Sequence, residues 1–113
     1  MFKLAIAALI VFAAKFTLKS EGVDKVFSVT LTAKRLGQDD VSEQLEAVEF
    51  RFKDFLLSKD LVSNWENQRL VLLDDDTPAP FSPDAFAYML DQQGVAKAIY
   101  DTYLRECGAK AKN

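Results

Sequence analysis

The feature that most restricts the fold is an alternation of apolar and polar residues near the N-terminus. In Lys15–Ser20, and again in Val26–Lys34, apolar residues recur at every second position. A period of two is typical of β-strands with one buried face. The short connection between the two runs contains Gly22, which favours a turn. The sequence therefore predicts an antiparallel β-hairpin within residues 1–36.

After Gly37 the period changes, because apolar residues now recur at spacings of three and four. This spacing places them on one side of a helix. Asp40 and Glu43 resemble a capping box, in which two side chains satisfy backbone N–H groups at the start of a helix. A single helix is therefore predicted from about Asp40 to Ser58. The following segment, Leu61–Leu73, is expected to be either a short third strand or an extended connection.

The clearest break in the chain is Asp74–Phe81, whose two prolines lack backbone N–H groups and favour extended geometry. Helical signals resume directly after it. Ser82 suits the N-cap, and Pro83 suits the first helical position. Gly94 separates this helix from a last one, in which apolar residues recur every four positions as far as Cys107.

These segments fit one domain of the α+β class, in which the hairpin packs with three main helices. The chain has 113 residues and is half hydrophobic, so it is long enough and apolar enough to bury a core. The expected organisation is a β-hairpin region at 1–36, a mainly helical region at 40–107 and a frayed tail at 108–113.

The composition excludes several kinds of chemistry. The chain has no histidine, which is the commonest general base near neutral pH and the commonest metal ligand. Its single cysteine, Cys107, cannot form an internal disulfide, and its place on an apolar helix face favours a buried structural thiol. The formal net charge of −3 gives no general attraction to nucleic acid or anionic membranes. No catalytic residue, cofactor, nucleic-acid partner or membrane partner is therefore predicted.

Three consecutive aspartates, Asp74, Asp75 and Asp76, raise the question of a metal site. Carboxylates of a calcium-binding loop alternate with other residues, in a D-x-D-x-D pattern that also contains glycine. These three are adjacent and lack that glycine. We therefore expect a solvated acidic turn and no metal ligand.

The N-terminus allows two interpretations. Lys3 precedes the apolar run Leu4–Ala14, an arrangement that resembles a secretory signal peptide with cleavage after Ala13. The run is too short to span a bilayer, and it continues without a polar break into the first strand pattern. A buried N-terminal segment of a cytoplasmic domain is favoured, and export with removal of residues 1–13 stays open as the alternative.

The order of the segments resembles that of a known family. Trp65 precedes the acidic turn and Ser-Pro of DDDTPAPFSP, which lead into the helix DAFAYML and then into GVAKAIYDTYLREC. The start MFK and the strand FSVTLTAKRL are similar too. With these motifs the chain resembles the tail assembly chaperones of long-tailed bacteriophages and prophages. It departs from them in lacking the usual Asp-Gly of the acidic turn and in having a more apolar N-terminus.

This resemblance implies a non-enzymatic factor of the bacterial host cytoplasm, absent from the mature virion, that binds the tape measure protein and helps recruit tail tube protein. Such a chaperone needs apolar surface with an acidic rim to hold amphipathic helices. The expected protein-binding residues are Phe50, Trp65, Asp74, Asp75, Asp76, Phe81, Phe86 and Tyr88. Three possibilities stay open: a head–tail connector or other structural phage protein, an exported small binding module, and assembly into a homo-oligomer.

Overall fold

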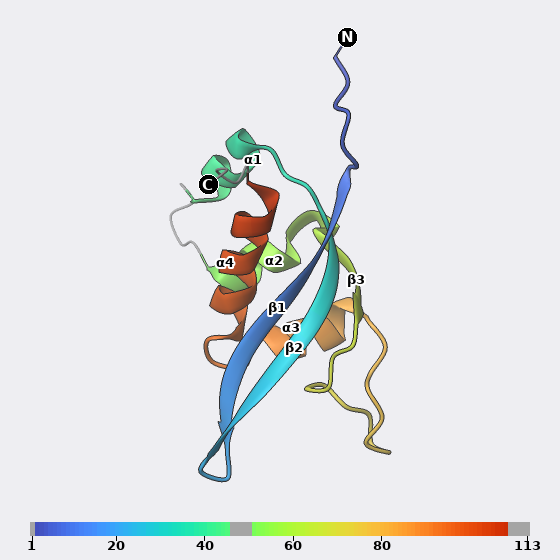
Figure 1. Ribbon diagram of the computed structural model, residues 1–113, viewed down its shortest axis with the longest axis vertical. Helices are drawn as coiled ribbons and strands as arrows, with labels where there is room; N and C mark the ends of the chain where they lie inside the picture. Colours follow the sequence, from blue (N-terminus) through green and yellow to red (C-terminus); the bar gives the residue numbers. More distant parts are fainter. Residues whose placement is uncertain (1, 46–50, 109–113) are drawn as a thin grey trace, which may run out of the picture.

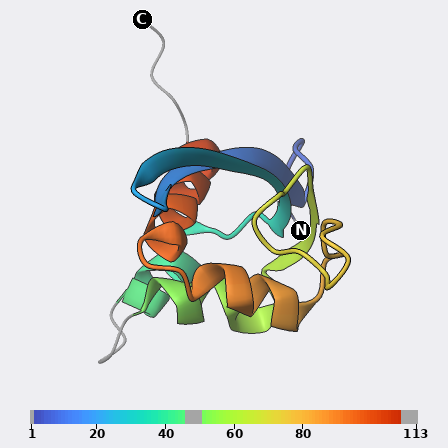
Figure 2. The same ribbon diagram turned by 90° about the horizontal axis from the view of Figure 1, so that it is seen from below.

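A computed structural model describes residues 2–45 and 51–108 of the chain. The described residues form an antiparallel sheet of β1 (Leu9–Ser20), β2 (Val23–Lys34) and β3 (Val62–Glu66), in the order β1-β2-β3. The helices cover one face of this sheet, as Figures 1 and 2 show. The predicted α+β class and N-terminal hairpin are confirmed, and the segment left open after the first helical region supplies the third strand.

The hairpin turn consists of Glu21 and Gly22 alone, because Ser20 pairs directly with Val23. Both turn residues have positive φ angles, 53° and 79°. Two central residues with positive φ mark a type I′ turn, whose twist matches that of the flanking strands. This geometry lets β1 and β2 pair without interruption over their whole length.

The N-terminal apolar run is divided between β1 and an exposed segment. Alternate residues of β1 face the helices and are buried: Ile10, Phe12, Ala14 and Phe16. The apolar side chains that precede β1 are exposed instead: Phe2, Leu4 and Ile6. The expectation of a buried N-terminal segment is therefore wrong for residues 2–8. The reason is that pairing with the chain of β2 ends here: the last hydrogen bond runs from the N–H of Arg35 to the carbonyl of Ala8 at 2.9 Å, and α1 begins three residues after Arg35.

The described helices are α1 (Gln38–Leu45), α2 (Phe52–Leu57), α3 (Pro83–Leu90) and α4 (Val95–Cys107), with a 3-10 turn at Ser58–Asp60. None of these helices is both long enough and apolar enough to cross a membrane. The predicted frayed tail lies outside the described residues, except for its first residue.

The single helix predicted from Asp40 to Ser58 is wrong. The first helix begins two residues before Asp40, which is therefore not its N-cap, and Arg51 is extended (φ −131°, ψ 133°) where α2 begins. Separate placement of α2 allows Phe55 to lie edge-on against Tyr100 of α4, with ring centroids 5.1 Å apart. Burial of such rings stabilises the fold by more than helix propensity does.

The predicted start of α3 and the predicted end of α4 are confirmed, but α3 ends at Leu90 and not at Gly94. The Ser82 hydroxyl accepts a hydrogen bond from the N–H of Ala85 at 3.0 Å, and Pro83 occupies the first turn. Gly94 has φ 86° and stands directly before α4. The predicted apolar faces are buried at Phe86, Met89, Leu90, Val95, Ile99 and Tyr103. Cys107 is half-buried, and burial raises the pKa of its thiol.

Tyr103 joins α4 to the end of β2. Its hydroxyl donates to the carbonyl of Lys34 at 2.6 Å and accepts from the N–H of Leu36 at 3.1 Å. Burial raises the pKa of this phenol above its usual range. Beside it, the Arg35 guanidinium donates to the carbonyl of Cys107 at 3.1 Å. These bonds attach the C-terminal half of α4 to the chain at the end of β2.

Candidate functional site

The segment between β3 and α3, residues 67–82, carries four of the eight predicted binding residues, and we call it the acidic loop. In Figure 1 it projects from the β3 side of the molecule as a yellow hairpin-like excursion. Its two arms are joined by backbone hydrogen bonds: the N–H of Ala79 donates to the carbonyl of Val71 at 3.0 Å, and that of Leu73 donates to Thr77 at 2.8 Å. The loop therefore has a defined shape of its own.

A buried glutamine, Gln68, holds the base of the acidic loop. Its amide nitrogen donates to the carbonyls of Val71 (2.8 Å) and Ala79 (3.2 Å). Its amide oxygen accepts from the N–H groups of Leu70 (3.1 Å) and Val71 (2.8 Å). The indole N–H of Trp65 donates to the same carbonyl of Ala79 at 3.1 Å. The loop is thus fixed to the core at its base.

Sequence reasoning missed Gln68. The residues that flank Gln68 in the sequence do not distinguish this buried glutamine from an exposed one such as Gln92. The signal that identifies it is three-dimensional. Its amide oxygen satisfies the N–H groups of Leu70 and Val71, and its amide nitrogen adds a second donor to the carbonyls of Val71 and Ala79.

The three aspartates form the tip of the loop and are exposed. One oxygen of Asp75 accepts hydrogen bonds from the hydroxyl (2.6 Å) and the N–H (3.2 Å) of Thr77. These bonds lower the pKa of the Asp75 carboxyl. Asp76 has a positive φ of 65°, and its N–H donates to the carbonyl of Leu73 at 2.9 Å. Asp75 thus shapes a turn, as the sequence predicts.

Among residues 2–45 and 51–108, no group of three or more acidic or cysteine side chains is placed to hold a metal ion. The acidic tip instead presents exposed negative charge. Charge at the rim of an interface mainly sets the rate and specificity of association.

Replacing Thr77 by valine should raise the pKa of Asp75 toward the ordinary value of 3.8, because the stronger of its two donors is lost. A lowered folded-state pKa stabilises the fold above the unfolded pKa, and this contribution is lost as pH falls through the folded pKa. NMR titration of the side-chain carboxyl from about pH 2 to about pH 6 measures the change. Thr77→Ser keeps the hydroxyl and should keep the low pKa of Asp75. The same Asp75 pKa in the valine and serine variants would contradict the hydrogen bond from the Thr77 hydroxyl.

The predicted aromatic residues do not share one surface. Trp65 is only 6% exposed, and its ring lies 6.4 Å from that of the buried Phe86. Phe81 is half-buried and packs edge-on against Trp65 at 5.6 Å. Tyr88 is 66% exposed. Phe50 lies outside the described residues.

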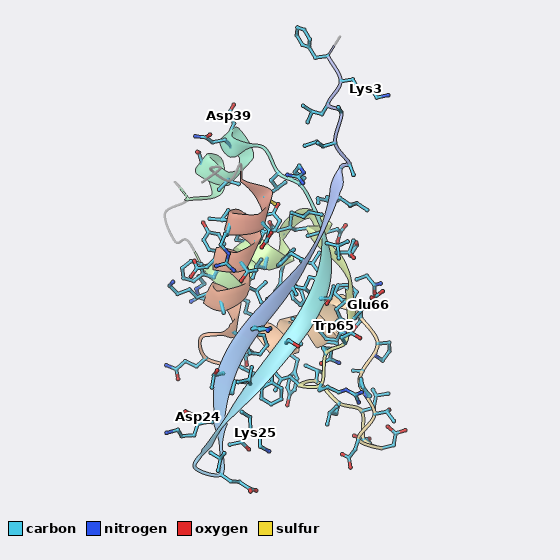
Figure 3. The ribbon with its side chains drawn as sticks, in the orientation of Figure 1. Lys3, Asp24, Lys25, Asp39, Trp65 and Glu66 are labelled. Atoms are coloured by element: carbon cyan, nitrogen blue, oxygen red, sulfur yellow. The ribbon has the colours of Figure 1, made fainter. Side chains whose placement is uncertain are left out.

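The expectation of exposed apolar surface is therefore wrong for Trp65 and Phe86. Successive residues of a strand point to opposite faces. Trp65 and Glu66, labelled in Figure 3, illustrate this in β3: the indole is buried against α3, whereas Glu66 is exposed. Because α3 covers the same face of the sheet, Phe86 closes the core from the other side.

Other residues supply the exposed apolar side chains of this region, and we call them the apolar patch: Leu72, Leu73 and Tyr88. The two leucines immediately precede the aspartates on the acidic loop. Beside them, Leu70, Tyr88 and Gln92 line an open pocket of about 190 Å³ together with Val71. Two exposed leucines thus directly precede the acidic tip, and of the predicted aromatic residues that the structure describes Tyr88 alone is exposed.

A larger open pocket of about 430 Å³ lies between the end of β3 and the proline-containing arm of the loop. Trp65 and Phe81 contribute to its wall, together with Pro78 and Pro80. Polar side chains line the rest of it, among them Asn64, Glu66 and Arg69, so the pocket is of mixed character. Through this pocket, two of the predicted aromatic residues border the surface although their rings belong mainly to the core.

Comparison of the chain with protein-family models, curated proteins and solved structures gives no match. The apolar patch, the acidic tip and the order of the sequence motifs are therefore the observations from which a function is inferred.

Proposed function

We propose that this protein is a non-enzymatic tail assembly chaperone of a long-tailed bacteriophage or prophage. In this role it binds the tape measure protein and helps recruit tail tube protein in the host cytoplasm. One observation carries the proposal: Leu72 and Leu73 are exposed beside three exposed aspartates on a loop held by buried hydrogen bonds. The order of motifs from Trp65 to Cys107, which resembles that family, supports it.

The arrangement suits an amphipathic helix as the ligand. Such helices bind by laying an apolar face into an apolar surface, and here the leucines and Tyr88 supply that surface. The aspartates at the tip attract the basic residues that flank such a face. Because Gln68 fixes the loop before binding, little conformational entropy is lost when the partner docks.

Cytoplasmic action is proposed over export for a physical reason. Cleavage after Ala13 would remove Ile10 and Phe12, whose buried side chains pack in the core. It would also remove nearly half of β1, which pairs with β2 from Leu9 onward. Mass spectrometry of the native protein should therefore find residues 2–13 attached to the folded chain; a cleaved form would favour the exported binding module.

Co-expression with the tape measure protein of the same genome tests the proposal. The wild-type chain should keep that protein soluble and co-purify with it, whereas the double variant Leu72→Asp and Leu73→Asp should weaken binding about tenfold or more. Both positions are exposed, so the variant should fold normally.

Val26→Asp is the matched control, since Val26 is 70% exposed but lies on the hairpin away from the acidic loop. It should bind as the wild type does. The proposal would be contradicted if the double aspartate variant bound the tape measure protein as tightly as the wild type does, or if the wild type did not bind it. Presence of the protein in purified virions would favour a head–tail connector instead.

A further inference from the structure

The first strand forms an edge of the sheet. Within the described chain, β1 pairs with β2 on one side only. Ala8 accepts from Arg35, so the even-numbered residues direct their backbone groups toward β2. The odd-numbered residues from Leu9 to Lys19 therefore direct their N–H and C=O groups to the open side. Val11, in the middle of this edge, is 65% exposed. A long edge with apolar side chains is a template for pairing with another strand.

The segment before β1 continues the pattern of the buried face. Phe2, Leu4 and Ile6 are even-numbered, as are the buried residues of β1. In an extended chain they would point to the same side as the core. Yet this segment runs past the end of the helices, and Figure 1 shows it leaving the body of the molecule. In the described structure the chain bends at Ala5, Ile6 and Ala8, and Leu4 and Ile6 line an open pocket of about 370 Å³ with Leu36. These exposed side chains would reach the inner face of the sheet only when the segment straightens.

The opposite end of the sheet has the complementary feature. An open pocket of about 580 Å³ lies beneath the hairpin tip, lined by the half-buried side chains of Leu18 and Phe27 and, facing them, Leu70 and Gln92. Figure 3, in which Lys3 marks the N-terminal segment and Asp24 the hairpin tip, shows this segment and the tip at opposite ends of the long axis. An antiparallel arrangement of two copies would bring each N-terminal segment to the partner's pocket.

We propose that two copies of this chain pair through their β1 edges, antiparallel about a two-fold axis at Ala13. In this register Ile6 lies opposite the partner's Ser20, and Ala8 lies opposite the partner's Leu18. The pairing then uses the whole edge from the N-terminal segment to the hairpin turn. The side chains of Ile6 and Ala8 lie on the inner face, where they cover the partner's pocket.

The charges agree with this register. Lys15 lies opposite the partner's Val11, and Lys19 lies opposite the partner's Ala7, so no like charges face each other across the axis. The contact is isologous: each copy contributes one N-terminal segment and one pocket, and the assembly closes at two. The result is one continuous antiparallel sheet, formed by β-strand addition.

Disulfide cross-linking tests both the contact and its register. The Ala13→Cys variant is made in a Cys107→Ala background, which removes the native thiol. Directly opposed residues of antiparallel strands have Cα atoms about 4.5–5.5 Å apart, which suits a disulfide. Mild oxidation should therefore convert most of this variant to a covalent dimer.

Thr17→Cys in the same background is the matched control, because Thr17 is exposed on the same edge. The two copies of this residue would stand eight positions out of register, roughly 27 Å apart at about 3.4 Å per residue. No rapid cross-linking is expected there. Equal cross-linking at both positions, or none at position 13, would overturn the proposal.

Sedimentation velocity supplies an independent measurement without cysteines. The wild type should be dimeric at about 100 μM, and Ala13→Lys, which opposes two ammonium groups at the axis, should weaken dimerisation about tenfold or more. Ala13 is exposed, so this variant should remain folded. A wild type that is monomeric at this concentration would overturn the proposal. That result would leave the tape measure proposal intact, since the latter depends on Leu72 and Leu73.

Discussion

Replacing Trp65 by alanine should lower the free energy of unfolding by about 3–5 kcal/mol, the usual cost of truncating a large buried ring. The indole is 6% exposed and contacts Phe81 and Phe86 edge-on. Its N–H also donates to the carbonyl of Ala79 at 3.1 Å. Domains of this size are stable by about 5–15 kcal/mol, so the loss is a large fraction of the whole.

Urea unfolding followed by far-UV circular dichroism measures this loss. Tyr88→Ala is the control, because truncation of an exposed side chain should change stability by less than about 0.5 kcal/mol. Trp65→Phe, which keeps an apolar ring, should be intermediate and remains measurable if the alanine variant does not fold. If Trp65→Ala were as stable as the wild type and instead lost its partner, the indole would belong to the binding surface.

Replacing Gln68 by leucine should lower the free energy of unfolding by about 2–4 kcal/mol. The leucine fills a similar volume but leaves the N–H groups of Leu70 and Val71 without their hydrogen bonds at the buried base of the loop. A buried polar group that loses its partner costs about 1–3 kcal/mol. The arms of the acidic loop should therefore separate, and binding of the tape measure protein should fall although the apolar patch is unchanged.

Amide hydrogen exchange measures the loosening of the acidic loop at individual residues. Exchange should accelerate at Val71 and Ala79 in the leucine variant before it does so in the hairpin. Gln92→Leu is the matched control: Gln92 is exposed, and its amide reaches only the carbonyl of Tyr88, at 3.4 Å. Unchanged exchange at Val71 would contradict the role assigned to Gln68.

The fold class could be predicted because the two hydrophobic periods are well separated along the chain. A period of two before Lys34 and spacings of three and four after Gly37 specify a hairpin followed by helices. The start of α3 was predictable to the residue, since Ser82 and Pro83 act locally, through one side-chain hydrogen bond and one fixed dihedral angle.

The misplaced features depend on contacts between distant segments. The N-terminal run has one continuous apolar pattern, but only alternate residues of the part that pairs with β2 are buried. Likewise, helical periodicity carries no information on where α2 must begin for Phe55 to reach Tyr100. In both cases tertiary packing decides between local alternatives that the sequence leaves nearly equal.

In the candidate site, too, features set by neighbouring residues were predictable and features set by tertiary packing were not. The acidic turn was predictable, because Asp75 and Thr77 interact over two residues. The exposure of the aromatic residues was not, because an indole or phenyl ring suits a core as well as an interface. The leucines of the apolar patch gave no sequence signal, since exposure of an apolar side chain is decided by what the rest of the fold leaves uncovered.

The central claim is that this chain acts by offering apolar side chains of the acidic loop to another polypeptide. Hydrogen–deuterium exchange of the protein, alone and in complex with the tape measure protein, tests it most directly. Binding should protect amides between Leu70 and Thr77 and in the last turn of α3 around Tyr88, and should leave those of β2 unchanged. A complex that forms without protecting the acidic loop, or no complex at all, would contradict the account.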